Sequence, residues 1–190
     1  MRWMPALALL GLTGCGYNRI QTMDEQVNAS KSQIEVQLQR RADLVPNLVE
    51  TVRGVAAQEQ TVFIAVAEAR SRLAGAVQSH DVGQMAEANQ VLTGALGRLI
   101  AIAEAYPQLR SSENFRALQD QLEGTENRIS TARQDYNDAV RDYNAYIRRF
   151  PQVLTAKLLG KGARDYFALT SPGAAEVPRV NFGGDSTRAR

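Results

Sequence analysis

A stripe of apolar residues between positions 112 and 150 constrains the fold of this chain more than any other feature. Its members alternate steps of three and four, the spacing of one face of a long α-helix packed against another helix. The stripe consists of Phe115, Leu118, Leu122, Thr125, Ile129, Ala132, Tyr136, Ala139, Tyr143 and Ile147. The sequence therefore predicts a coiled-coil-like helix here, the longest in the chain, which Pro151 ends.

The rest of the chain also shows helical periodicity. Apolar residues recur at helical spacing over residues 18–41, 46–78 and 82–106, and a shorter amphipathic stretch covers residues 153–159. The segment 43–46 is either a kink or the start of the second helix, because Pro46 lacks the N–H that a helix interior uses. These patterns predict an all-α fold, an antiparallel bundle of about four long helices plus a short C-terminal one.

The first fifteen residues predict where the chain is located. Arg2 precedes an apolar run over residues 4–12, and small residues separate this run from Cys15, the only cysteine. This order is typical of a secretory signal peptide, and the run is shorter than the roughly 20 apolar residues that span a bilayer. The string Leu12-Thr13-Gly14-Cys15 resembles the lipobox of bacterial lipoprotein precursors. The resemblance implies cleavage between Gly14 and Cys15 and a diacylglyceryl group on the Cys15 thiol.

The predicted domains are a cleaved signal peptide over residues 1–14, a helical bundle over residues 15–169 and a mobile tail over residues 170–190. Two acyl chains anchor a protein stably where one binds marginally, so the membrane is the first predicted partner. The bundle would lie outside the cytoplasm. Gly16, in place of Asp, fits the outer membrane, facing the periplasm, of a Gram-negative host. Alternatively, Cys15 is an incidental thiol after an ordinary signal peptide, or a buried apolar residue.

Charge excludes one class of partner. The chain has 22 Lys and Arg against 20 Asp and Glu, and the two signs are interspersed along the predicted helices. No basic face is available for a nucleic-acid backbone, so we predict no nucleic-acid partner.

A set of short motifs resembles the LemA family of bacterial envelope proteins. The longest are RRxDLVPNLVE, beginning at Arg40, and ENFxxLQxxLExTENRI, beginning at Glu113. The others are Tyr17-Asn18, Glu59, Ala69-Arg70, Ala132-Arg133, Tyr136-Asn137, Tyr143-Asn144, Phe150-Pro151, Pro178, Arg179, Val180 and Phe182. The resemblance implies an antiparallel bundle of long helices held at a membrane by its N-terminus. Members usually have an N-terminal transmembrane helix, whereas this chain has the shorter lipobox-like segment. The biochemical activity of the family is not established, so no catalytic set is transferred.

The residues themselves predict no enzyme. Nucleophilic catalysis needs a histidine base beside Ser or Cys, yet the only histidine, His80, lies in a predicted turn, and the only thiol is expected to be acylated. Glu-x-x-His pairs and cysteine clusters are absent, so no metal and no cofactor is predicted. Glu123 and Glu126, three apart on one helical face, form either an acid–base pair or an ion-pair network with Arg128 and Arg133.

One polar cluster is the best candidate for a contact beyond packing. Arg40, Arg41, Asp43, Asn47 and Glu50 surround Pro46. They are predicted either to cap backbone N–H groups and bond neighbouring helices, or to contact a partner. Tyr136 and Tyr143, one heptad apart, are expected on the seam, with Asn137 and Asn144 beside it.

Two function hypotheses follow. The leading one is a membrane-anchored, non-enzymatic envelope lipoprotein that serves as an interaction scaffold for other envelope proteins. The rival is an envelope enzyme or small-ligand binder that uses surface carboxylates and arginines. A concave, buried cluster built from Glu123, Glu126 or Arg40 would favour the rival.

Overall fold

The computed structural model describes residues 4–168, and this part of the chain contains six α-helices and no strand. The helices are α1 (Met4–Arg53), α2 (Gln60–Ser79), α3 (Val82–Glu104), α4 (Pro107–Arg110), α5 (Glu113–Ile147) and α6 (Gln152–Leu158). The predicted all-α bundle, with four long helices and a short C-terminal one, is confirmed. The predicted tail and the four C-terminal motif residues lie outside the described residues.

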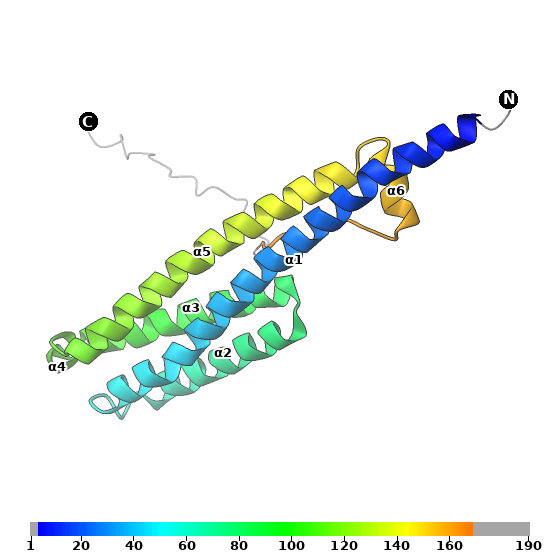
Figure 1. Ribbon diagram of the computed structural model, residues 1–190. Helices are drawn as coiled ribbons and strands as arrows, with labels where there is room; N and C mark the ends of the chain where they lie inside the picture. Colours follow the sequence, from blue (N-terminus) through cyan, green and yellow to red (C-terminus); the bar gives the residue numbers. More distant parts are fainter. Residues whose placement is uncertain (1–3, 169–190) are drawn as a thin grey trace, which may run out of the picture.

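The long helices form an extended antiparallel arrangement (Figure 1). α1 and α5 run antiparallel along each other and make up the length of the molecule, while α2 and α3 form a hairpin beside the half of α1 farthest from the N-terminus. α6 packs against α1 and α5 at the opposite end of the molecule. The N-terminal turns of α1 project past α6.

The predicted stripe on α5 is the seam of the α1–α5 pair. Ile129, Tyr136 and Tyr143 are at most 3% exposed, and both tyrosines therefore lie on the seam as expected. On α1, the matching buried residues are Ile20, Val27, Ile34, Leu38, Val45, Leu48 and Val52. Each fully buried side chain of this size stabilises the fold by about 1.5–3 kcal/mol relative to an exposed one, so this seam is the main source of cohesion.

Of the two alternatives at Pro46, the start of a second helix is wrong, because α1 continues through the proline to Arg53. Pro46 has no N–H to donate to the carbonyl oxygen of Ala42, four residues earlier. Arg70, on α2, donates its Nε–H to that oxygen at 2.8 Å instead. The α2 arginine thus satisfies the group that the proline leaves free, and the buried residues Leu48 and Val52 extend the seam beyond it.

The remaining boundaries follow local signals. Asp81 caps α3 by accepting from the Gln84 backbone N–H at 2.8 Å, and Ser112 caps α5 through the Phe115 N–H at 3.4 Å. His80 ends α2 in the left-handed conformation, with φ of 55°. The prediction that α5 is the longest helix is wrong, since α1 has 50 residues against 35. Residues 4–14 of the predicted signal segment and the stretch after Pro46 both join α1, which accounts for the difference.

After α6 the chain returns along the bundle without regular structure. Gly160 has φ of 65°, a conformation that favours glycine, and residues 161–168 then follow. We call residues 161–168 the strap. Arg164 lies beside Asn144 and Phe167 beside Asn137, so the strap runs antiparallel to α5.

Candidate functional site

A groove runs between α1 and α5 on one side of the pair. Its main hollow has a volume of about 770 Å³, and a smaller one of about 240 Å³ continues it, sharing Gln26, Ala139 and Asp142. The α1 lining is Arg19, Thr22, Met23, Gln26, Ala29, Ser30, Gln33 and Gln37. The α5 lining is Asn127, Arg128, Thr131, Ala132, Asp135, Asp138, Ala139 and Asp142. We call this surface the α1–α5 groove.

Helical geometry explains why this side is hollow. Asp24 and Ala42, which contact the strap and α2, are about five turns apart and share one side of α1. Gln33 lies two and a half turns after Asp24, on the opposite side. On α5, Asp135 likewise lies two and a half turns before Asn144, which contacts the strap. The α2–α3 hairpin and the strap thus cover one side of the pair, and the α1–α5 groove occupies the other.

Small side chains form the floor of the groove, and polar side chains form its rim. Ser30 and Ala132 are 7% and 8% exposed, and side chains of this size leave a depression between helices. On the α5 rim, Arg141 pairs with Asp138 at 2.6 Å and with Asp142 at 3.4 Å. The Oε1 atom of Gln37 is buried and has no hydrogen-bond partner among the described residues. A polar partner whose ridge of side chains enters this depression fits the surface.

A second polar cluster lies inside the bundle, where α1, α3 and α5 meet. The guanidinium of Arg41 donates to Asn89 Oδ1 at 2.6 Å and pairs with Glu126. Burial lowers the pKa of Arg41, and the charge of Glu126 acts in the opposite sense. Arginine stays charged at any physiological pH, so this cluster is a fixed polar bond between three helices.

The strap is held by two asparagines one heptad apart. Asn144 accepts the Arg164 backbone N–H at 2.8 Å and donates to the Arg164 carbonyl at 2.9 Å. Asn137 accepts the Phe167 N–H at 2.8 Å and donates to the Phe167 carbonyl at 3.3 Å. Each amide thus binds one strap residue through both backbone groups, as a neighbouring β-strand would.

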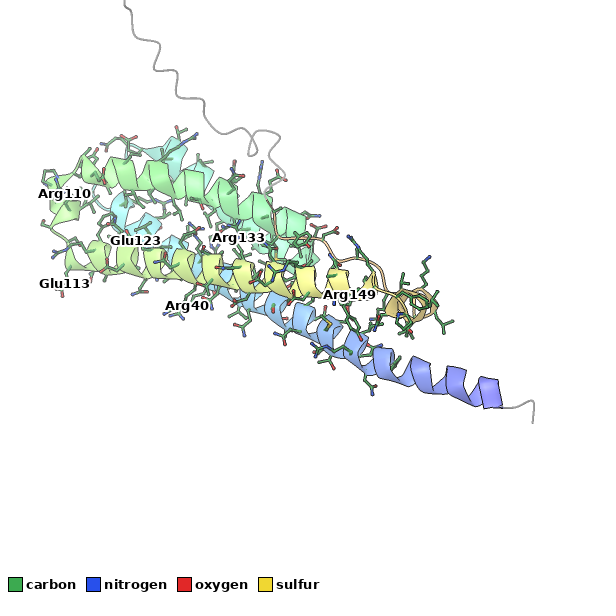
Figure 2. The ribbon with its side chains drawn as sticks, turned by 90° about the horizontal axis from the view of Figure 1, so that it is seen from above. Arg40, Arg110, Glu113, Glu123, Arg133 and Arg149 are labelled. Carbon is green, nitrogen blue, oxygen red and sulfur yellow. The ribbon has the colours of Figure 1, made fainter. Side chains whose placement is uncertain are left out.

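Side chains add to this hold on the strap. Asp24, 6% exposed, accepts from Lys161 Nζ and from Arg164 Nη2, each at 2.7 Å. The guanidinium of Arg133 lies 4.9 Å from the centre of the buried Phe167 ring, within cation–π range. Figure 2 shows Arg133 on α5, between the two ends of the bundle.

The Asp24 carboxyl makes strap docking dependent on pH. Burial alone raises its pKa, but the hydrogen bonds and charges of Lys161 and Arg164 outweigh burial, and the net pKa is lowered. The pKa of an Asp carboxyl in the unfolded chain is about 3.9. The bonds of Asp24 therefore stabilise the docked strap fully at neutral pH, and this stabilisation is lost as the pH falls below about 3.9. We expect amide-exchange protection of Arg164 and Phe167 to hold from neutral pH down to about pH 4 and to fall below it, beyond the intrinsic effect of pH.

The same loosening should occur at neutral pH in Asp24→Asn. Two charge-assisted bonds are weakened, but their cations are partly exposed, so we expect about 1–2 kcal/mol less protection of the strap. Asp135→Asn is the matched control, since Asp135 lies on the groove side and has no ion pair among the described residues. Unchanged strap protection in Asp24→Asn would contradict the assigned role of Asp24.

The structure separates the residues of the predicted polar cluster. Arg41 is buried, whereas Arg40, Asp43, Asn47 and Glu50 are exposed along α1. Asp43 accepts from Gln39 Nε2 at 2.9 Å, and Glu50 pairs with Arg53 at 3.0 Å. Because α1 continues through this segment, no helix begins here for these side chains to cap. A contact between the four exposed residues and a partner stays a prediction.

Glu123, Glu126 and Arg40, from which the rival hypothesis would build a concave cluster, do not come together. Glu126 turns to Arg41, while Glu123 is exposed and contacts Gln119 at 3.5 Å. His80 is exposed and contacts Glu35 at 2.9 Å. Among the described residues, no group of three or more His, Cys, Asp and Glu side chains is arranged to hold a metal ion.

Sequence reasoning missed Asp24, Asn89, Lys161 and Arg164. The signal for Asp24 was a charge close to the apolar face of a predicted helix, but its partners are 137 and 140 residues away. Asn137 and Asn144 were placed correctly beside the seam, without their partner, the strap. Cys15 lies within α1, and its side chain is outside the described part.

Comparison with known proteins identifies similar sequences. The model of the LemA family matches residues 30–182. The magnetosome proteins MamQ 1 and MamQ 2 of Paramagnetospirillum magneticum are each 31% identical to this chain over 174 residues. Magnetosome protein MamQ of Magnetospirillum gryphiswaldense is 30% identical over 174 residues. Each match covers 80% of this chain and 64% of the relative, so the chain spans less than two thirds of the length of these proteins.

Proposed function

The chain belongs to the LemA family, and on that premise we propose that it is a lipid-anchored cell-envelope protein that binds partner proteins in the α1–α5 groove without catalysing a reaction. The observation that carries the proposal is the groove itself. It runs along two long helices on the side that the hairpin and the strap leave open. The opposite side is closed by the chain's own segments.

The groove suits a helix of a partner protein. Two antiparallel helices with small residues between them offer a furrow into which the ridge of a third helix packs. Ala29, Ser30 and Ala132 supply the small residues, and the amides and carboxylates along the rim supply hydrogen-bonding groups. These rim groups are polar enough to stay in water when no partner is bound, as a reversible interface requires.

The anchor that we propose is the lipid on Cys15. Of the helices in the described part of the chain, none is both long and apolar enough to cross a membrane. Gly16 is buried and Ile20 is the first buried apolar side chain after Cys15, so the bundle would begin within a few residues of the lipid. Partners would therefore be met close to the membrane surface, whether in the periplasm or at another envelope face.

Site-specific crosslinking in the host cell tests the groove. A photoreactive residue at Gln33 or at Thr131, on the two facing rims, should capture the same envelope protein. Ala29→Trp, at an exposed alanine in the groove, should reduce this capture at least about tenfold by filling the furrow. Ala101→Trp, at an exposed alanine of α3, is the matched control and should leave capture unchanged.

The outcomes separate the hypotheses. Two results together support a groove scaffold: both rim positions capture a protein, and Ala29→Trp abolishes this capture. Equal capture from probes at Ser71 and Ala101, which are exposed on the hairpin, would contradict a specific groove. No captured protein from either rim would remove the support for the scaffold role.

A further inference from the structure

The end of the bundle at α6 exposes large apolar side chains. Phe150 is 81% exposed, Leu154 60% and Leu158 85%, although α6 has only seven residues. The three residues follow each other at steps of four, so Leu154 and Leu158 share one face of α6, and Phe150 precedes them. Ala156 is the buried residue of the helix. Three such side chains in a row on the surface mark an interaction site more often than single exposed residues do.

The segment that carries these side chains is basic, unlike the interspersed charges along the long helices. Residues 143–164 contain no Asp or Glu but five basic residues. Lys161 and Arg164 are bound to Asp24, whereas Arg148, Arg149 and Lys157 are exposed and have no ion pair within the described residues. Figure 2 shows Arg149 at the end of α5 next to α6, at the end opposite Arg110 and Glu113. Apolar side chains beside unpaired cations are the combination that binds an anionic bilayer surface.

The α6 end is also where the chain enters the bundle from its N-terminus. Gly16 is buried against α6, since a Cβ built there would lie 3.7 Å from Gln152 Cγ and 3.8 Å from Thr155 Oγ1. Cys15 is the preceding residue. Both figures show the N-terminal turns of α1 leaving the bundle past α6. The exposed patch and the proposed lipid therefore lie at the same end.

We propose that Phe150, Leu154 and Leu158, with Arg148, Arg149 and Lys157, form a second membrane contact that binds the surface of an anionic lipid bilayer. We call these six residues the α6 patch. The apolar side chains enter the boundary between headgroups and acyl chains, and the cations bind lipid phosphates. The proposal rests on the proposed function for the position of the bilayer. The affinity of the patch for the bilayer does not depend on an acyl group on Cys15.

The contact would orient the bundle. A lipid on Cys15 alone is one point of attachment and leaves the bundle free to swing. A second point on α6, beside the first, fixes the direction of the α1–α5 pair relative to the membrane. The groove would then face partners at a defined height above the bilayer.

Vesicle sedimentation of an unlipidated chain tests the patch. The probe is the chain from residue 15 carrying Cys15→Ser, which keeps every buried core residue from Ile20 onward; its helicity and melting temperature are checked first. We expect it to bind vesicles of phosphatidylcholine with phosphatidylglycerol, to bind pure phosphatidylcholine weakly, and to dissociate in high salt. Leu154→Ser with Leu158→Ser should weaken binding at least about tenfold.

The matched control removes two exposed apolar residues elsewhere. Val36→Ser with Ile64→Ser changes side chains that are 62% and 58% exposed, far from α6 in the sequence, and should leave binding unchanged. No binding to anionic vesicles, or equal binding by the α6 variant, would overturn the proposal. A dimer that appears in sedimentation equilibrium and that the α6 variant abolishes would also overturn the proposal. The patch would then join two copies of the chain.

This test is independent of the proposed function. The probe carries no lipid and no partner, so a failure here leaves Cys15 lipidation and the groove untouched. Conversely, a chain that is not lipidated in the cell, or that captures no partner, can still bind anionic vesicles through the α6 patch.

Discussion

Replacing Arg41 with alanine should lower the free energy of unfolding by about 3 kcal/mol, a large share of the 5–15 kcal/mol typical of a folded domain. The Arg41 side chain is 6% exposed and bonds Asn89 on α3 and Glu126 on α5. Its loss leaves the buried Asn89 without its donor and the partly exposed Glu126 without its cation. Glu126 is 41% exposed and can recover some hydration, so the expected cost lies at the lower end of the 3–5 kcal/mol range for broken buried pairs.

Urea denaturation followed by circular dichroism measures this effect. The adjacent substitution Arg40→Ala is the control, because Arg40 is exposed on the same helix and should change stability by less than about 0.5 kcal/mol. Equal effects of the two substitutions would mean that the cluster of Arg41, Asn89 and Glu126 does not join the helices as described.

The second large effect is expected at Cys15. Cys15→Ser should leave the precursor unprocessed and without acyl chains. The thioether needs the thiol, and a hydroxyl does not replace it. Fractionation of cells and labelling with a radioactive or clickable fatty acid measure both consequences. We expect labelling to be lost altogether, because the chain has no second cysteine.

A neighbouring substitution controls for general damage to the N-terminal region. Gly16→Ala adds a Cβ that would meet Gln152 and Thr155 at ordinary contact distances, so it should fold, be labelled and be retained at the membrane. A Cys15→Ser chain that is processed normally and stays with the membrane would rule out the lipid anchor.

Local periodicity predicted much of the fold. The stripe on α5 and the turn at His80 are set by residues close in sequence, and the structure confirms them. A helix start at Pro46 was one of two alternatives and is wrong, because the compensating group comes from another helix. Arg70 supplies the hydrogen bond to the Ala42 carbonyl, and no pattern around Pro46 reveals that partner.

The candidate site depended on long-range packing and was less predictable. The α1–α5 groove exists because the hairpin and the strap both cover the opposite side of the pair, a choice that helical spacing alone does not make. Arg41 and Arg40 are equivalent in sequence, yet one is buried and the other exposed. Asp24 gains its role only when residues more than a hundred positions away return along α5.

The intact mass of the protein purified from its host membrane tests the anchor most directly. For a lipid-anchored protein, we expect the measured mass to be that of a chain starting at Cys15, without residues 1–14, plus the mass of a diacylglyceryl group. Trp3 would be lost with the signal peptide, so the same sample should lack tryptophan absorbance and fluorescence. A mass equal to that of the whole 190-residue chain, or of a chain from Cys15 with a free thiol, would contradict the account.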